Sequence, residues 1–521
     1  MHRRHFISGL LSASAMARLA PAGLLASSAA PAPAQGAIDV AKRFGFVGDG
    51  RTDNYEAFHR FADHVNRSGG GSYVFPAGTY YVARYRTAPL GTIDRRHTIN
   101  PDIIGVNGLT ITGYGARIVL NGNFHRKGGA KGRDGLVPGA HIATVVPFNI
   151  RGSRNVRIAG FEMDGGVRGM SRGLDVPEAY AYLISLQACA DVVLEDMDLH
   201  HSMTDAVVLG DDFILTGRLP GRACRNVTLR KVKCRNNARG GLAPLHVYGL
   251  SATDCEFNSN GFPGDKYHWH APGFGVDIEP DRGMEGENID IRTGNLEFVR
   301  CNFYDNFSAI LAAYVQSFRG YCRFIDCNTR NRNDGPNHII AAWPGEGILI
   351  QGGDHDAGKG CIWLSWQGQH GGKSTLRNMR IRSAHDFGLL HSQGNNVAVV
   401  EGCTITGTHT APGEGNFIFF GQVPGGGRRN VFRGNRVFLP AARNDKGKAW
   451  DIEPNFGHTD LTDNVYTTDL KVPGQHFARG YDAATCTVRN ERFQGAFPGP
   501  RDTFRPIASG ETHDTRRPFS S

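Results

Sequence analysis

The feature that most restricts the fold of this chain is a repeat of about 30 residues that begins near residue 100. Each unit holds two or three short aliphatic strands and polar loops, with no helical stripe. Equivalent strand openings recur at Ala206, Gly241, Gly275, Ala309, Ile339, Gly360, Gly388, Asn416 and Lys448. Strands this short need stacked neighbours to bury their apolar side chains. The repeat therefore predicts an all-β solenoid, rather than a propeller or a tandem of sandwiches.

Residues 38–83 differ from the repeat and predict a cap on its N-terminal end. Asp53 or Asn54 can cap a helix that continues to about Val65, and a run of three glycines from Gly69 would stop it. The apolar stripe of this helix comprises Ala57, Phe58, Phe61, Ala62 and Val65. An amphipathic helix ahead of a repeat array is expected to cover the open end of the core.

The first 34 residues have the character of an export signal. Paired Arg3 and Arg4 precede a weakly apolar stretch rich in Ala, Ser and Leu, and Ala32-Pro33-Ala34 is a small-residue cleavage site. We expect a twin-arginine signal, with an ordinary secretory signal as the alternative, and hence a periplasmic or secreted protein. The β-helix domain is then predicted over 35–465, with a C-terminal cap and flexible tail over 466–521.

Charge and hydropathy limit the partners. The formal net charge is +9, of which three charges fall in the signal, and such a modest excess would suit an acidic polymer. The arginines are scattered, with no basic helix or single-strand platform, so nucleic acid is not expected as a partner. We find no membrane-spanning apolar run after the signal. The oligomeric state stays open.

The ten cysteines are expected to be buried free thiols. An even count in an exported chain would ordinarily suggest disulfides. Five of them, however, occupy one recurrent position next to a strand: Cys234, Cys255, Cys301, Cys327 and Cys403. Small thiols stacked at equivalent positions suit the interior of a solenoid.

Two segments resemble a known superfamily. The run GFVGDGRTDN…AFHRFADHV…GGGSYVFPAGTYYV, and the coils from Ala238 to Pro280, are similar to the pectate-lyase-like (pectin-lyase fold) superfamily. The resemblance covers most of residues 38–465. It implies a right-handed parallel β-helix and a carbohydrate polymer as substrate. Members include polysaccharide lyases, glycoside hydrolases, epimerases and phage tailspikes, so it leaves the reaction open.

Asp277 and Glu279 are the first candidates for catalysis. Strand alternation predicts Val276 and Ile278 facing the core and the two acids side by side on the open face. With Cα atoms about 6.6 Å apart, the acids could span the separations of either retaining or inverting glycosidases. A solvated strand face would show the same pattern. A second copy of the motif, at 450–454, indicates that it can also be a scaffold feature.

Further acids bracket the strand predicted two coils earlier. Asp205 precedes that strand, where polygalacturonase-type hydrolases carry an aspartate, and Asp211 and Asp212 follow it. The Asn-Thr-Asp and Arg-Ile-Lys motifs of those hydrolases are missing here, and Arg239-Gly-Gly replaces their Gly-His-Gly. Polygalacturonase identity is therefore not expected. Asp211 and Asp212 are predicted to contact substrate, to bind a cation such as Ca²⁺, or to form a plain turn. Arg239 would add positive charge to the groove.

The loop before Asp277 carries Lys266, His268, Trp269 and His270. Lysine and histidine can move the C5 proton of a uronate, and tryptophan can stack on a sugar ring. A surface loop with a packed tryptophan is the alternative. His268 and His270 lack an evident third ligand, so no metal site is predicted.

These patterns predict an exported enzyme that cleaves glycosidic bonds of a polysaccharide lying along the β-helix. A glycoside hydrolase is favoured, with Asp277, Glu279 and Asp205 as catalytic groups and no cofactor beyond the Ca²⁺ option. The substrate-binding residues would be Asp211, Asp212, Arg239, Lys266, His268, Trp269 and His270. The alternatives are a polysaccharide lyase acting by β-elimination on a uronate-containing glycan, and a non-catalytic glycan-binding β-helix.

Overall fold

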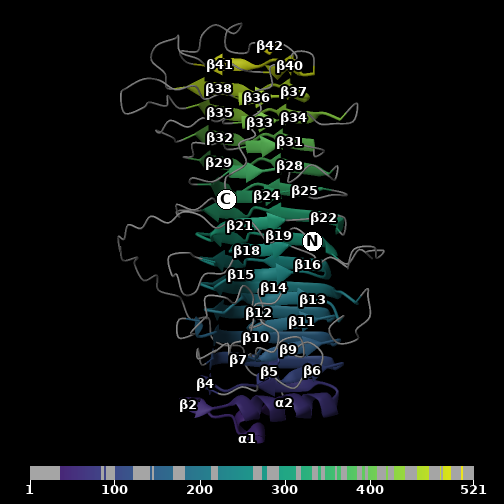
Figure 1. The fold of residues 1–521 in the computed structure, drawn as a ribbon, viewed down its shortest axis with the longest axis vertical. Coiled ribbons are helices and arrows are strands. Elements are labelled where there is room, and N and C mark those ends of the chain that lie inside the picture. Colours follow the sequence, from purple (N-terminus) through teal and green to yellow (C-terminus); the bar gives the residue numbers. More distant parts are fainter. Residues whose placement is uncertain are drawn as a thin grey trace, which may run out of the picture.

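Short parallel strands stack on one another along the long axis of the molecule (Figure 1). All strand pairings among the described residues are parallel except that of β5 (Thr87–Pro89) with β8 (His141–Ala143). The computed structural model describes residues 36–83, 87–89, 100–120, 141–143, 146–167, 182–212, 221–261, 273–278, 293–312, 318–330, 338–341, 347–357, 361–364, 372–383, 390–392, 397–407, 418–420, 428–439, 454–468, 481–482, 485–494 and 506–507.

One face of the stack is a 14-stranded sheet to which each coil contributes one short strand. In stacking order its strands are β6 (Asp102–Ile104), β9 (Phe148–Arg151), β11 (Ile184–Gln187), β13 (Asp205–Gly210), β15 (Gly240–Pro244), β18 (Phe274–Ile278), β21 (Ser308–Ala312), β24 (His338–Ala341), β27 (Cys361–Trp363), β30 (Leu390–Ser392), β33 (Ile418–Phe420), β36 (Pro454–Phe456), β39 (Tyr481–Asp482) and β42 (Pro506–Ile507).

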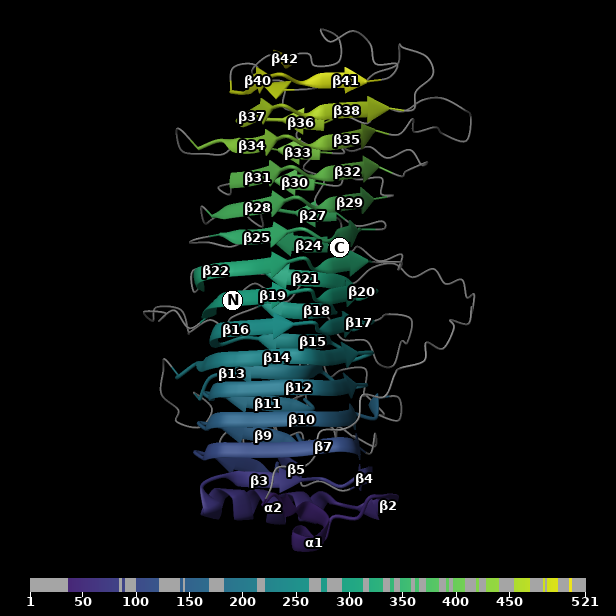
Figure 2. The same cartoon turned by 180° about the vertical axis from the view of Figure 1, so that it is seen from behind.

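The rest of each coil belongs to a 26-stranded sheet, best seen from behind (Figure 2). At its N-terminal end lie the short strands β1 (Ile38–Asp39), β2 (Asp49–Asp53), β3 (Gly71–Val74) and β4 (Gly78–Val82). Four long strands follow: β7 (Asn107–Leu120), β10 (Arg154–Asp164), β12 (Ala190–His200) and β14 (Cys224–Arg235). After β14 each coil carries two strands in its place. One series is β16 (Val247–Thr253), β19 (Thr293–Val299), β22 (Phe318–Ile325), β25 (Ile348–Gln351), β28 (Lys373–Arg377), β31 (Val397–Glu401), β34 (Asn430–Arg433), β37 (Thr459–Thr462) and β40 (Thr487–Arg489). The other is β17 (Glu256–Asn258), β20 (Asn302–Tyr304), β23 (Asn328–Arg330), β26 (Asp354–Asp356), β29 (Arg380–Ser383), β32 (Thr404–Gly407), β35 (Arg436–Leu439), β38 (Val465–Thr468) and β41 (Arg492–Gln494).

The stacked strands bury one continuous apolar column. Leu242 and Val276 are register partners in neighbouring coils, and both are fully buried. Equivalent aromatic side chains stack directly, as do the rings of Phe298 and Phe324, whose centroids lie 4.7 Å apart. The solenoid predicted from the repeat, and the parallel β-helix that the resemblance implies, are therefore confirmed. The predicted strand openings at Ala206, Gly241, Gly275, Ala309 and Ile339 lie in strands of the 14-stranded sheet, whereas those at Gly360, Gly388, Asn416 and Lys448 lie outside the described residues.

Two helices close the N-terminal end of the stack, α1 (Val40–Phe44) and α2 (Tyr55–Ser68). The entire predicted stripe of α2 is buried, which confirms the amphipathic capping helix. The helix runs three residues beyond Val65 and ends at Gly69, whose φ of 71° is a left-handed conformation that suits glycine. Asn54 occupies the N-cap position, but its side chain bonds to the turn at Val47 instead of to the helix.

The cap also covers the edge of the 14-stranded sheet. That sheet ends at β6, which among the described strands pairs only with β9. On the other side the Asn66 side chain of α2 donates to the carbonyl of Asp102 at 2.8 Å and accepts from the amide of Ile104, also at 2.8 Å. A single side-chain amide thus makes the two contacts that a neighbouring strand would otherwise make.

The cysteines whose side chains the structure describes are free thiols, as predicted. The described free cysteines are Cys189, Cys224, Cys234, Cys255, Cys301, Cys322, Cys327 and Cys403, all buried, together with the partly exposed Cys486. Burial raises the pKa of Cys189 and of Cys403 to about 11. These thiols are therefore protonated at neutral pH and poor nucleophiles.

Asparagines stack at the turn that leads into the 14-stranded sheet. Asn260 Oδ1 accepts from the Asn237 backbone amide at 3.1 Å and from Asn237 Nδ2 at 2.9 Å. Asn260 Nδ2 in turn donates to Asn306 Oδ1 at 3.0 Å and to the Cys234 carbonyl at 3.1 Å. The three side chains are buried. These three asparagines therefore form a ladder that satisfies backbone groups of successive turns.

Stacking continues past residue 465. Strand β40 pairs with β37, and β41 pairs with β38, so the coils extend at least to Gln494. The predicted signal lies outside the described residues, as does most of the predicted tail. None of the described helices is both long and apolar enough to span a membrane.

A histidine buried in the core links stability to pH. His355 lies between Thr329 Oγ1 and the Gly352 carbonyl, each 3.1 Å away, and burial lowers its pKa from 6.5 to about 4. Between those values the unfolded chain binds a proton that the folded chain does not. The free energy of unfolding should therefore fall by ~3 kcal/mol as the pH drops through this window. Urea denaturation of wild type and His355→Asn at pH 7.5 and pH 4.5 checks this. An equal pH dependence in the two proteins would contradict it.

Candidate functional site

Three residues predicted as site residues converge in three successive coils. Asp205 is the first residue of β13, Arg239 immediately precedes β15, and Asp277 is the fourth residue of β18. The Arg239 guanidinium lies between the two acids, with Nη2 3.3 Å from Asp277 Oδ2 and Nη1 3.8 Å from Asp205 Oδ2. Both aspartates are 1% exposed. We call Asp205, Arg239 and Asp277 the carboxylate–guanidinium cluster.

Strand register and a glycine place this cluster. Asp205 pairs with Gly240, which pairs with Phe274, so the three coils are aligned at this position. A Cβ on Gly240 would lie 2.6 Å from Asp205 Oδ1, and the missing side chain therefore leaves the room that the carboxylate occupies. The Arg239 amide donates to the Thr204 carbonyl at 3.2 Å, which fixes the backbone that carries the guanidinium.

The open, solvated setting predicted for Asp277 is wrong. Val276 and Ile278 do enter the core, as strand alternation predicts, but Asp277 is buried and faces Arg239. Alternation gives the side of the strand to which a residue points; it does not give how much protein covers that side. Glu279 lies outside the described residues, so its pairing with Asp277 stays a prediction.

The side chains of Asp211 and Asp212 contact different residues. Asp212 accepts from the Arg222 backbone amide at 2.5 Å and from its Nε at 2.7 Å. Asp211 Oδ2 lies 3.8 Å from His246 Nε2. Ca²⁺ binding at this pair stays a prediction. The predicted substrate-binding residues Lys266, His268, Trp269 and His270 lie outside the described residues.

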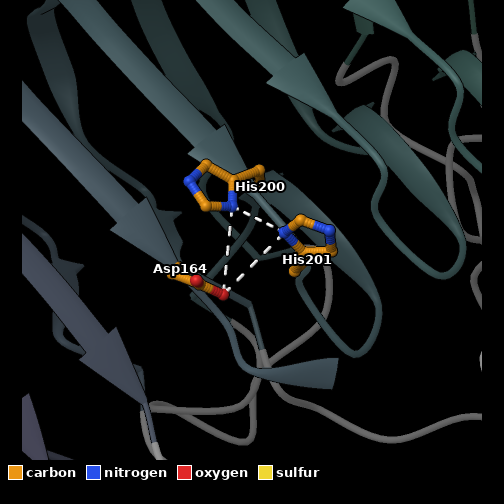
Figure 3. Close-up of side chains that lie close together, drawn as sticks. All are labelled: Asp164, His200 and His201. Atoms are coloured by element: carbon orange, nitrogen blue, oxygen red, sulfur yellow. Dashed lines mark hydrogen bonds and ion pairs between the residues drawn. The ribbon is translucent and has the colours of Figure 1, made fainter. Parts of the chain in front are cut away.

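Sequence reasoning missed a second cluster, Asp164, His200 and His201, at the ends of β10 and β12 (Figure 3). Within the described part of the chain, it is the one group of three or more His, Cys, Asp or Glu whose ligand atoms all lie within 4.8 Å of one another. Aligning FEMDGG with MDLHHS would have found it, because Asp164 pairs in register with His200.

A buried acid near the N-terminal end was also missed. Asp102 in β6 accepts a hydrogen bond from Asn149 Nδ2 at 2.5 Å, and its Oδ1 lies 3.8 Å from Arg151 Nε. Burial raises the pKa of Asp102 to about 6, although the Arg151 charge and the Asn149 bond oppose the shift. Asn149 is the register partner of Asp102 in the next coil. No pattern in the sequence indicates that Asp102 is buried.

Comparisons with known proteins find distant structural likenesses and no match in sequence. No family model matches the chain, and no curated protein matches it. Solved structures that resemble it include the A-module of a mannuronan C-5 epimerase from Azotobacter vinelandii, with 12% identity over 88% of this chain and 99% of that chain and a TM-score of 0.43. A surface adhesin of Streptococcus pneumoniae shows 11% identity over 88% and 90%, with a TM-score of 0.43. An exopolygalacturonase from Thermotoga maritima shows 14% identity over 89% and 93%, with a TM-score of 0.36. The parallel β-helix fold of this chain rests on its own strand order and parallel strand pairing.

Proposed function

We propose that this protein is a carbohydrate-active enzyme, a glycoside hydrolase whose carboxylate pair is Asp205 and Asp277. The supporting observation is that both carboxylates lie within 4 Å of one guanidinium although they come from coils two steps apart. Two carboxyl groups flanking the scissile bond are what hydrolysis of a glycosidic bond requires. Their low exposure keeps bulk water away and strengthens electrostatic interactions at the site.

The two acids take different roles in this proposal. One must protonate the leaving oxygen, and the other must act as an ionised base or nucleophile. The shorter contact with Arg239 favours the ionised form at Asp277, so Asp277 is assigned as the base or nucleophile. Asp205 is then the acid. The sequence-based assignments of Glu279 as a further catalytic acid and of Lys266, His268, Trp269 and His270 as substrate contacts are kept in this proposal.

Aspartate-to-asparagine variants test the assignment. A panel of neutral and acidic polysaccharides is first read for new reducing ends, which identifies a substrate of the wild-type protein. On that substrate, Asp205→Asn and Asp277→Asn should each lower kcat by at least about 100-fold, the usual contribution of one acid or base. Asp254→Asn is the matched control, because Asp254 is also paired with an arginine but lies on the exposed surface. Circular dichroism verifies that each variant is folded.

The roles separate with an activated substrate. An aryl glycoside with a good leaving group needs little protonation, so Asp205→Asn should recover most of its activity on it, whereas Asp277→Asn should not. Unchanged polysaccharide cleavage in both variants would rule out the carboxylate pair.

The same panel distinguishes the alternatives carried by the sequence. An unsaturated uronate chromophore in the product would identify a lyase, and would overturn hydrolysis. Binding of a polysaccharide without new reducing ends or unsaturated product on any glycan would favour a non-catalytic glycan-binding β-helix.

A further inference from the structure

We propose that Asp164, His200 and His201 bind a divalent transition-metal ion of the zinc class. We call these three residues the His–His–Asp cluster. It is a different group of residues from the carboxylate–guanidinium cluster, and the proposal does not depend on the proposed hydrolase activity.

The ligand atoms converge from two neighbouring coils (Figure 3). His200 Nδ1 and His201 Nδ1 lie 2.7 Å apart, and Asp164 Oδ1 lies 3.9 Å from each of them. Zinc binds imidazole nitrogen and carboxylate oxygen at about 2.0–2.2 Å, so an ion near the centre of this triangle can contact all three atoms after a small adjustment. Because Asp164 and His200 are register partners, the β-helix itself brings two of the ligands together.

A left-handed turn residue supplies the third ligand. His201 directly follows His200, and consecutive residues of a regular strand point to opposite faces. His201 instead has a φ of 54°, in the left-handed region that non-glycine residues seldom adopt. This conformation directs the second imidazole toward the first, and the two rings lie nearly perpendicular, at 86°.

A carboxylate outside the triangle orients His200. Its Nε2 lies 3.2 Å from Glu162 Oε1, so Nε2 carries the proton and Nδ1 presents its lone pair to the centre. Donation of the second ring nitrogen to a carboxylate is the arrangement that supports metal-bound histidines. Arg117 holds both acids, with Nε 2.9 Å from Glu162 Oε1 and Nη2 2.8 Å from Asp164 Oδ2.

The donor set selects the class of ion. Two nitrogens and one oxygen suit zinc and related transition metals, whereas Ca²⁺ and Mg²⁺ prefer oxygen ligands throughout. The side chains of His201 and Asp164 are 16% and 19% exposed, so solvent can reach the cluster and supply a fourth ligand. The bound ion would also stiffen the turn into β13, since Ser202 in that turn donates to the Asp205 carbonyl at 2.9 Å.

Metal titration of chelator-treated protein tests the site. Isothermal titration with Zn²⁺ should show one site in wild type that His201→Ala and Asp164→Asn weaken by at least 100-fold. His64→Gln, which changes a histidine of α2, should bind as wild type does. The variants replace partly exposed side chains, and circular dichroism confirms that they fold. Equal Zn²⁺ stoichiometry and affinity in wild type and His201→Ala would overturn the proposal.

Cobalt gives an independent reading of the ligands. One equivalent of Co²⁺ should produce the intense visible bands of four-coordinate cobalt in wild type and in His64→Gln, and not in His201→Ala. Sulfur-to-cobalt charge-transfer bands would place the ion on cysteine and would overturn the assignment. Neither measurement involves catalysis, so the result is independent of the hydrolase proposal.

Discussion

The Arg239→Met protein should unfold at pH 7 with a free energy of unfolding about 3–5 kcal/mol below that of wild type. Arg239 is largely buried and lies within 4 Å of two buried carboxylates. Methionine keeps much of the side-chain volume but removes the positive charge, which leaves the ionised Asp277 carboxylate beside Asp205 in a poorly solvated environment without the guanidinium. Urea denaturation monitored by circular dichroism measures the loss.

Two further variants test whether the loss of stability comes from the buried charge. Arg300→Met removes a guanidinium from an exposed pair with Asp254 and should change stability far less, because solvent screens that pair. Adding Asp205→Asn and Asp277→Asn to Arg239→Met should restore most of the lost stability, since no buried charge then remains. Equal losses for Arg239→Met and Arg300→Met would contradict the buried-charge explanation.

The Asn260→Ala protein should lose about 3–6 kcal/mol of its free energy of unfolding. Asn260 is fully buried and bonds to groups of three neighbours. Alanine leaves the Asn237 amide groups and the Cys234 carbonyl buried without this partner, and each such group costs about 1–3 kcal/mol. Thermal and urea denaturation measure the change.

Asn302→Ala is the matched control for the ladder. Asn302 also bonds to side chains of neighbouring positions, but it is only partly buried, so water can replace the lost bonds. We expect a loss of about 1 kcal/mol or less. If Asn260→Ala were no more destabilised than Asn302→Ala, the ladder would be an incidental arrangement of side chains.

The repeat and the cap could be predicted because each rests on a local pattern that the fold preserves. Stacking requires equivalent residues to recur, so the predicted strand openings at Gly241 and Gly275 align. The apolar stripe predicted for α2 corresponds to its buried face. The recurrent position of the cysteines likewise indicated the core, and the thiols are found there.

The chemistry was harder to predict because it depends on contacts across coils. Nothing local places Arg239 between Asp205 and Asp277, and alternation alone suggested that Asp277 is exposed. The His–His–Asp cluster depends on the register of β10 with β12 and on one left-handed residue, His201. The equivalent turn position is also left-handed in the following coils, at Asn236, Ser259 and Asp305, so the conformation belongs to the repeat and does not by itself mark a pair of histidines.

The side-chain amide of Asn66 bears on end-to-end strand pairing between two copies of this protein. When a solenoid ends in an uncovered strand, the free backbone groups of that strand can pair with another copy. Repeated head-to-tail pairing of this kind would produce fibres. At the N-terminal end the hydrogen-bonding positions of Asp102 and Ile104 are already taken by a side chain. A second molecule at this end would contact α2 instead of an open strand edge. The cap therefore leaves the backbone groups of Asp102 and Ile104 already hydrogen-bonded, so that this part of the sheet edge cannot pair with a strand of another molecule while Asn66 stays in place.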